Sequence, residues 1–331
     1  MGVIGAGGWG TALAKLLCEK DYDVILWCHG EPSCREIEQK RENCSYLPRI
    51  LLPDALEVTR SLKEAVSGKN IIFFAVPSHH LREVAQSAKP DVSPDTVIVC
   101  GTKGLEERTL MTMGDLLSEI FGESRREKLV FLSGPTFALE VARGLPAAMT
   151  AASLDDEVCT AVQEVLSTQS FRVYRSRDIV GVQLGGVVKN VIAIAAGICD
   201  GLSLGSNARA ALITRGLAEM TRLAVRMGAE PLTLSGLPGL GDLVLTCTGT
   251  LSRNRGVGVE IGRGKSLDEI LSGMRMVAEG VRNTSAVHLL AQRLGVEMPI
   301  VDQMYQVLYE GKNPSEAARD LMQRALKPEI G

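Results

Sequence analysis

The chain has 331 residues, a length that suits two domains of ordinary size. Apolar residues make up 45% of the chain and charged residues 23%, and 36 basic against 39 acidic side chains give a formal charge of −3. This composition excludes a disordered or fibrous protein, and it gives no sign of a basic surface for nucleic acid or an anionic membrane.

Short apolar runs alternate with helical patterns along the first half of the chain. Because these runs are apolar throughout, they fit strands that are buried on both faces, as in a parallel sheet. We therefore expect a Rossmann-like, doubly wound α/β domain over residues 1–178. The expected strands are 1–4, 24–27, 71–76, 97–100, 129–132, 147–151 and 171–174, and the expected helices are 10–19 and 62–66.

From about Asp178 onward the strand pattern stops, and an all-α domain over residues 179–331 is predicted. Its expected helices are 187–199, 208–227, 267–271, 284–294, 299–309 and 314–325. In the second of these, a polar stripe lies beside apolar positions, which is typical of an amphipathic helix. The stripe is formed by Arg215, Glu219, Arg222 and Arg226.

The cysteines and the apolar segments restrict the class of protein further. No stretch reaches the roughly 18 uninterrupted apolar residues of a spanning helix, and the first residues do not resemble a signal peptide. The eight cysteines form no C-x-x-C pair, and no histidine lies at zinc-ligand spacing from them. We expect reduced thiols in a cytoplasmic protein, with no metal site; a disulfide framework is the less favoured alternative for a chain of this length.

A glycine-rich motif, G-x-G-x-x-G, connects the first expected strand to the helix that follows it. Gly5 permits a tight turn, Gly7 lets the backbone approach a pyrophosphate, and Gly10 lets the helix pack closely on the strand. The N-terminus of the helix then offers free N–H groups to phosphate oxygens. This context favours dinucleotide binding over the alternative, a glycine-rich turn without a ligand.

The end of the second expected strand bears on the choice of dinucleotide. NAD-binding domains usually carry an acidic residue here that holds the ribose 2′-hydroxyl. In this chain Cys28, His29 and Gly30 follow the strand, and Glu31 comes slightly late. His29 either faces the extra phosphate of NADP or is a plain loop residue, so the sequence leaves NAD and NADP both open.

Nine blocks in the chain together resemble the NAD(P)-dependent glycerol-3-phosphate dehydrogenase family, especially its bacterial form. They occur in the order typical of that family and span nearly the whole chain, which makes the combination far more specific than the glycine motif alone. The blocks are GAGGWGTA (5–12), TKGL (102–105), SGPTFA (133–138), GVQLGGVVKN (181–190), NARAALITRGLAEM (207–220), GLGDLVLTCT (239–248), SRNR (252–255), EGVRNT (279–284) and MPI (298–300).

The resemblance implies reversible oxidation of sn-glycerol 3-phosphate to dihydroxyacetone phosphate with NAD or NADP. It implies cytoplasmic supply of glycerol 3-phosphate for phospholipid synthesis, and a homodimer is the expected assembly. Two alternative functions stay open. One is that of a related dehydrogenase acting on a 3-hydroxy acid or a sugar-acid phosphate. The other is that of a nucleotide-sensing module without catalysis, which would not need Lys103, Lys189 and Asp242 together.

Lys189 is the strongest candidate for the base that takes the hydroxyl proton. It lies in a helix that is apolar nearly all round, where burial would lower the pKa of its ammonium group. The alternative is a lysine that extends to solvent from the end of a core helix. The resemblance likewise implies that Lys189 is the proton acceptor, and that its neighbour Asn190 contacts the substrate.

The other candidate site residues also have structural alternatives. Lys103 follows a strand and suits a phosphate or an oxyanion, or else it is an exposed loop lysine. Thr136 and Asp242 suit helix N-caps as well as substrate contacts, and Asp242 could also hold Lys189. Residues 252–255 by themselves resemble a solvated basic loop, although arginine also suits phosphate.

The resemblance assigns these residues to two groups of contacts. The substrate contacts that it implies are Lys103, Gly134, Thr136, Lys189, Asn190, Asp242, Ser252, Arg253 and Asn254. The cofactor contacts, counting those of the glycine loop, are Gly5, Gly7, Gly8, Trp9, Gly10, His29, Tyr46, Lys103, Ala138, Arg253, Val277 and Glu279.

Overall fold

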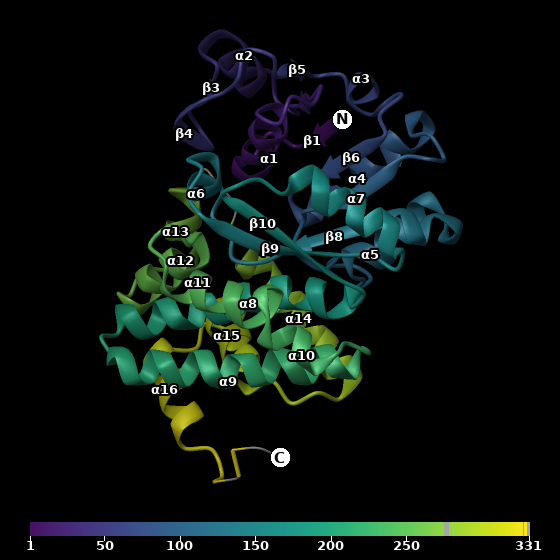
Figure 1. Cartoon of the computed structure of the whole chain (residues 1–331). Helices are drawn as coiled ribbons and strands as arrows, with labels where there is room; N and C mark the ends of the chain where they lie inside the picture. Colours follow the sequence, from purple (N-terminus) through teal and green to yellow (C-terminus); the bar gives the residue numbers. More distant parts are fainter. Residues whose placement is uncertain (275–277, 327, 330–331) are drawn as a thin grey trace.

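The computed structural model describes residues 1–274, 278–326 and 328–329. Figure 1 shows a sheet with flanking helices in the upper half and layers of helices in the lower half. The strands are β1 (Gly2–Ile4), β2 (Ile25–Trp27), β3 (Glu42–Asn43), β4 (Leu47–Leu51), β5 (Glu57–Thr59), β6 (Ile71–Phe74), β7 (Val97–Cys100), β8 (Leu129–Ser133), β9 (Ala147–Ala152) and β10 (Phe171–Ser176).

The helices are distributed over both halves. Those of the first half are α1 (Gly8–Cys18), α2 (Glu31–Lys40), α3 (Leu62–Val66), α4 (Ser78–Ala88), α5 (Met113–Phe121), α6 (Ala138–Ala142) and α7 (Asp156–Leu166). Those of the second are α8 (Ile179–Gly201), α9 (Gly205–Arg226), α10 (Pro231–Ser235), α11 (Asp242–Thr248), α12 (Arg253–Gly262), α13 (Leu267–Ser272), α14 (Glu279–Leu294), α15 (Pro299–Tyr309) and α16 (Pro314–Met322).

Eight strands form one sheet in the order β10-β9-β8-β7-β6-β1-β2-β5. From β8 to β5 every neighbouring pair is parallel, so the strand ends of this part meet at one edge. The predicted doubly wound domain is confirmed, with one departure: β9 runs antiparallel to β8. The carboxyl ends of β1, β2, β6, β7 and β8 share the edge where open α/β sheets bind ligands.

All seven predicted strands are present, and their ends differ by a few residues. The run predicted over 71–76 ends at Phe74, because the chain turns there and Pro77 begins the approach to α4. The sequence reading missed the hairpin of β3 and β4, and it missed β5. β3 and β5 are only two and three residues long, and the apolar residues of β4 are interrupted by Pro48 and Arg49, so none of these strands carries a run of four apolar residues.

The central helix of the second half is α8, which packs against β8 and β9 on one side and against α9, α11, α12 and α14 on others. Asp178 caps its N-terminus through a bond from the Gly181 N–H (2.8 Å). By length and composition alone this helix could cross a membrane, but 83% of its most apolar window is buried inside the protein. It is therefore the core helix that the sequence predicted, extended at both ends.

The predicted polar stripe of α9 does not lie wholly in solvent. Glu219 is only 2% exposed, and its carboxylate accepts bonds from the N–H groups of Ile300 (2.8 Å) and Val301 (3.3 Å) at the start of α15. Arg222 donates to the Glu297 carbonyl oxygen near the same point. Glu219 and Arg222 thus attach α9 to the start of α15. The dipole of α15 favours an anion at this N-terminus.

Replacing Glu219 by glutamine is expected to flatten the pH dependence of stability. Burial raises the pKa of Glu219 to about 7, against the opposing bonds from α15, so the folded protein holds this proton more tightly than the unfolded chain. As the pH rises from the unfolded pKa near 4.5 to the folded pKa near 7, the free energy of unfolding therefore falls, by about 3 kcal/mol in all. Urea unfolding at pH 5 and pH 8 should show most of that loss in the native chain and none of it in the variant.

Glu83→Gln, on the exposed surface of α4, is the matched control. It should follow the native chain at both pH values, since an exposed carboxylate contributes little to stability. Identical pH dependence in Glu219→Gln and the native chain would contradict the prediction.

Candidate functional site

The glycine loop between β1 and α1 has the geometry that a pyrophosphate needs. Gly5 has a φ of +115°, a conformation that side chains rarely allow, and a Cβ at Gly10 would overlap the Gly5 carbonyl oxygen. Gly7 differs from these two positions: an added Cβ would meet no atom within 4 Å, so open space lies beside this residue. The first turn of α1 has neither a side-chain cap nor an acidic residue, so its N–H groups suit an anion. These residues fit the phosphates of a dinucleotide.

Other predicted cofactor contacts lie around this loop. At Gly8, an added Cβ would stand 2.9 Å from the Tyr46 carbonyl oxygen and 3.7 Å from the Ala138 side chain, so both residues border the start of α1. The indole of Trp9 extends toward Gly101, at the end of β7. His29 is exposed after β2, with its ring edge-on to that of Trp27.

At the same edge of the sheet, one carboxylate joins two lysines. Asp242 accepts from Lys189 with one oxygen and from Lys103 with the other, the latter at 2.7 Å. The Lys189 ammonium also donates to the Thr246 hydroxyl (3.1 Å). Lys103 comes from the loop after β7, Lys189 from α8 and Asp242 from α11, so the cluster joins both halves of the chain.

The charges in this cluster shift each other's pKa values. Burial lowers the pKa of Lys189 to about 8; Asp242 opposes the shift and Lys103 adds to it. Burial alone would raise the pKa of Asp242, but the two ammonium groups outweigh it and hold that pKa below its ordinary value. Lys189 is 7% exposed, and with a pKa of about 8 roughly a tenth of this buried lysine is the free amine at pH 7.

Two adjacent glycines of α8 explain how these groups come together. A Cβ at Gly185 would overlap the Pro238 carbonyl oxygen, so the π-helical turn 237–241 can lie directly on α8 and deliver Asp242. A Cβ at Gly186 would stand 2.9 Å from the Ser133 hydroxyl and 3.3 Å from the Lys103 side chain. The absence of side chains at these positions therefore makes room for Asp242 and Lys103. Lys189, the third member of the cluster, lies one turn further along the helix.

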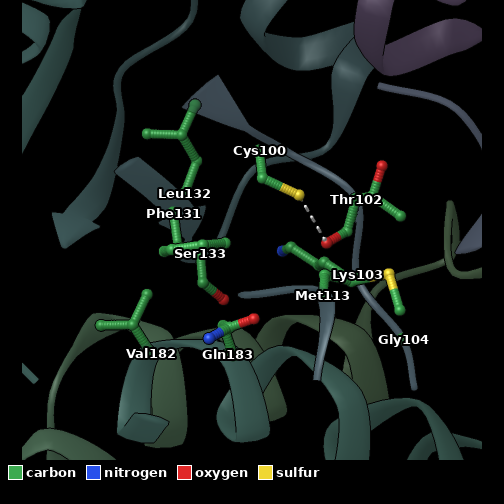
Figure 2. Close-up of a pocket in the computed structure, with 10 residues that line it drawn as sticks. All are labelled: Cys100, Thr102, Lys103, Gly104, Met113, Phe131, Leu132, Ser133, Val182 and Gln183. Carbon is green, nitrogen blue, oxygen red and sulfur yellow. Dashed lines mark hydrogen bonds between the residues drawn. The ribbon is translucent and has the colours of Figure 1, made fainter. Parts of the chain in front are cut away.

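Figure 2 shows Lys103 and Ser133 in the small cavity between the strand ends and α8, with the Ser133 hydroxyl directed toward the helix that carries Val182 and Gln183. The cavity measures about 10 Å³. Lys103 also approaches the Gly134 carbonyl oxygen (3.4 Å), which in turn accepts from the Thr136 hydroxyl (3.3 Å). The loop after β8 thereby lies beside the lysine cluster.

A chain of hydrogen bonds connects the starts of α12 and α14 with α8. The Asn254 side chain donates to Asn190 (2.9 Å) and accepts from the Gly280 N–H (2.9 Å). Ser252 caps α12 by accepting from the Arg255 N–H (3.2 Å), and Arg253 is exposed at the first position of that helix. The predicted basic loop is therefore a helix N-terminus next to the residue that follows Lys189.

Glu279, the first residue of α14, reaches back to the sheet edge. Its carboxylate accepts from the Ser78 N–H (3.3 Å) at the start of α4, the helix that follows β6. Burial raises its pKa to about 7, although that bond and the charges of Arg253 and Lys103 act in the opposite direction. Val277, predicted as a further cofactor contact, lies outside the described residues.

Several structural alternatives prove wrong. Lys189 does not extend to solvent, and Lys103 is an ion-paired residue whose side chain is only 22% exposed. Asp242 begins α11, but its carboxylate contacts the lysines rather than capping the helix. Thr136 is not a cap either, because α6 starts at Ala138 with Phe137 in the capping position.

Sequence reasoning missed two partners of the predicted residues, one that acts through its side chain and one that acts through its backbone. Thr246 contacts Lys189 and lies four residues after Asp242, so helical spacing would have placed both on one face. Ser78 contacts Glu279 through its backbone N–H, which no side-chain pattern reveals.

Comparisons with known proteins give matches over nearly the whole chain. Residues 1–159 match the family model described as NAD-dependent glycerol-3-phosphate dehydrogenase N-terminus, and residues 178–319 match the corresponding C-terminus model. A glycerol-3-phosphate dehydrogenase [NAD(P)+] of Syntrophotalea carbinolica is 53% identical over 330 residues, covering 100% of this chain and 99% of the relative. That of Citrifermentans bemidjiense is 53% identical, covering 99% of this chain and 98% of the relative.

A crystal structure of glycerol-3-phosphate dehydrogenase from Coxiella burnetii superposes with a TM-score of 0.93 at 42% identity, and it covers 97% of this chain and 98% of that one. More distant dehydrogenases share only the fold. A D-mandelate dehydrogenase, at 14% identity and a TM-score of 0.61, is one of them.

Proposed function

The chain belongs to the NAD-dependent glycerol-3-phosphate dehydrogenase family, and from this premise we propose that it interconverts sn-glycerol 3-phosphate and dihydroxyacetone phosphate. The cofactor is NAD or NADP, which the glycine loop of β1 and α1 fits. One observation carries the proposal: a nearly buried lysine with a lowered pKa lies with its carboxylate partner at the ligand-binding edge of a dinucleotide-binding sheet.

The reaction needs a hydride acceptor and a base. A nicotinamide dinucleotide held by the glycine loop would supply the first, as the acceptor of a hydride during oxidation of the substrate. Lys189 supplies the second: its neutral amine takes the hydroxyl proton during oxidation, and its ammonium returns that proton during reduction. A pKa of about 8 leaves both forms available near neutral pH.

Asp242 and Lys103 prepare this site electrostatically. The carboxylate holds both ammonium groups in place, and its charge keeps the pKa of Lys189 from falling further. Lys103 provides a cation close to where negative charge develops on the substrate oxygen. In this proposal Gly134 and Thr136 shape the adjacent wall of the substrate site.

The substrate phosphate is assigned to the start of α12. A helix N-terminus attracts anions, and the Arg253 guanidinium at its first position adds a charge suited to bidentate phosphate binding. The Asn254 side chain is engaged with Asn190 and Gly280, so we assign its backbone N–H, together with Ser252, to the phosphate. Asn190 orients the substrate hydroxyl groups, and Glu279 contacts the nicotinamide end of the cofactor.

The choice between NAD and NADP concerns the end of β2. Glu31, the nearest carboxylate after His29, is paired with Arg35 and, at 3.5 Å, with Arg60. These cations favour acceptance of an additional phosphate, and we therefore propose that NADP serves as well as NAD.

The organisation of the enzyme completes the proposal. We place the boundary between a dinucleotide-binding domain (1–178) and a helical catalytic domain (179–331) at the start of α8, where the match to the C-terminal family model also begins. All eight cysteines are free thiols, which supports a cytoplasmic enzyme that supplies glycerol 3-phosphate for phospholipid synthesis. A homodimer is also predicted. Light scattering of the purified protein measures the mass of the assembly and tests this prediction directly.

The test is the absorbance of the reduced nicotinamide band with dihydroxyacetone phosphate, using NADH and NADPH in parallel. We expect consumption with both, and a kcat/KM at least about 100-fold lower with dihydroxyacetone, because the phosphate supplies binding energy used in the transition state. A 3-keto acid tests the alternative function, a dehydrogenase that acts on a 3-hydroxy acid. Cofactor binding without turnover on any of these ketones would indicate a nucleotide-sensing module instead.

A further inference from the structure

The side chain of Asn43 is completely buried beneath the glycine loop. Its amide nitrogen donates to the Ala6 carbonyl oxygen (2.9 Å) and to the Thr11 hydroxyl (2.8 Å). Its oxygen accepts from the Tyr46 N–H (3.1 Å). A primary amide has two N–H donors and one carbonyl acceptor, so each of these is used.

The bond to Ala6 fixes one peptide unit of the loop. In a trans peptide the C=O and the N–H point in opposite directions, so holding the Ala6 carbonyl turns the Gly7 N–H away from Asn43. Gly7 is the position where an added Cβ would meet no atom within 4 Å. The bond thus orients this N–H away from the protein interior, as a pyrophosphate contact requires.

Backbone bonds hold the two ends of the loop, from the Gly5 N–H to the Trp27 carbonyl oxygen (3.1 Å) and from the Thr11 N–H to the Gly7 carbonyl oxygen (2.9 Å), and the bond from Asn43 holds the peptide between them. Glycine loses more backbone freedom on ordering than any other residue, and Gly7 and Gly8 are consecutive. A loop already ordered before its ligand arrives binds more tightly, because the ordering cost is not taken from the binding energy.

The same side chain connects the loop to the β3–β4 hairpin. Asn43 ends β3 and accepts from Tyr46, whose carbonyl oxygen lies 2.9 Å from the place of a Cβ at Gly8. The hairpin packs on α1 through β4. One amide therefore fixes both the peptide before Gly7 and the segment that borders Gly8.

We propose that Asn43 is a positioning residue for dinucleotide binding, which sets the Ala6–Gly7 peptide and the Tyr46 segment in the geometry that receives the pyrophosphate. The inference rests on the proposed dehydrogenase function. It concerns affinity for the dinucleotide and not the chemistry at Lys189.

Two substitutions in the full chain test this role. Asn43→Ala removes all three bonds. Asn43→Ser keeps a hydroxyl that can accept from the Tyr46 N–H, which preserves the turn, but this side chain is too short to reach Ala6. Both variants should raise the Kd for NADH about tenfold, measured by the fluorescence of the bound dinucleotide. The KM for dihydroxyacetone phosphate and kcat at saturating NADH should stay close to those of the native enzyme.

Thr11→Val is the matched control, since it removes the other partner of the Asn43 amide and leaves the bond to Ala6. It should lower the Tm while keeping the Kd for NADH within about twofold of the native value. Should Asn43→Ser, folded by circular dichroism, bind NADH as tightly as Thr11→Val does, Asn43 is merely structural and the proposal is overturned. Failure of the native chain itself to turn over would instead overturn the proposed function.

Discussion

Replacing Lys189 by alanine is expected to lower kcat by about a thousandfold in both directions of the reaction. The native side chain is nearly buried, has a pKa of about 8, and is the only member of the Lys103–Asp242–Lys189 cluster that is carried by the central helix α8. Without it, no amine takes or returns the substrate proton at that point. The Kd for NADH should change little, because Lys189 is not among the predicted cofactor contacts, and Lys103 keeps its ion pair with Asp242.

Small primary amines provide the control for this variant. Methylamine should enter the space left by the side chain and restore part of the turnover, with a pH dependence that follows the added amine. Turnover close to native in folded Lys189→Ala would refute the assignment of the base. Loss without any rescue, together with a lowered Tm, would indicate that the lysine acts only by holding Asp242.

Replacing Asp242 by asparagine is expected to lower kcat/KM by about 100-fold and to shift the pH profile. The carboxylate lies between two ammonium groups, so its loss leaves them close together without a counter-ion. Asp242 raises the pKa of Lys189, and removing its charge must lower that pKa from about 8. Oxidation of glycerol 3-phosphate needs the free amine, so the rising limb of its pH profile should move to lower pH.

Thr246→Val is the matched control for charge. It removes the uncharged partner of Lys189, 3.1 Å away, and leaves Asp242 in place, so the rising limb should move far less. Asp242→Asn should also reduce the free energy of unfolding by about 3 kcal/mol, as breaking a buried ion pair does. A shift of the limb toward higher pH in Asp242→Asn would contradict the electrostatic role.

The sequence revealed many of the elements whose residues carry a strong local pattern, although it missed the amphipathic helices α4, α5 and α7. The buried strands have continuous apolar runs, and β7 and α15 begin and end where predicted. The hairpin of β3 and β4 has no such run, because its residues are stabilised by contacts with α1 and α2 rather than by burial on two faces. The polar stripe of α9 was predicted, but not the bonds of Glu219, since no pattern within α9 indicates that this residue meets the N-terminus of α15.

The candidate site was predictable to a similar extent. A lysine in an apolar helix is costly to bury, and that alone singled out Lys189. Its partner Asp242 lies 53 residues away and Lys103 lies 139 residues from Asp242, so neither contact follows from local spacing. The adjacent Gly185 and Gly186 belong to a block that resembles the family, but only the packing shows that they make room for the π-helical turn and the Lys103 side chain.

The burial of α8 also has a consequence for the synthesis of the chain. The ribosome releases this long apolar segment before it makes α9, α11, α12 and α14, the helices that later enclose it. Until then the segments already synthesised, among them β8, β9 and the start of α5, can cover part of its surface. Exposed apolar surface of this kind promotes aggregation of incompletely folded chains, so the helix that holds the proposed base is also a segment that needs protection while the polypeptide grows.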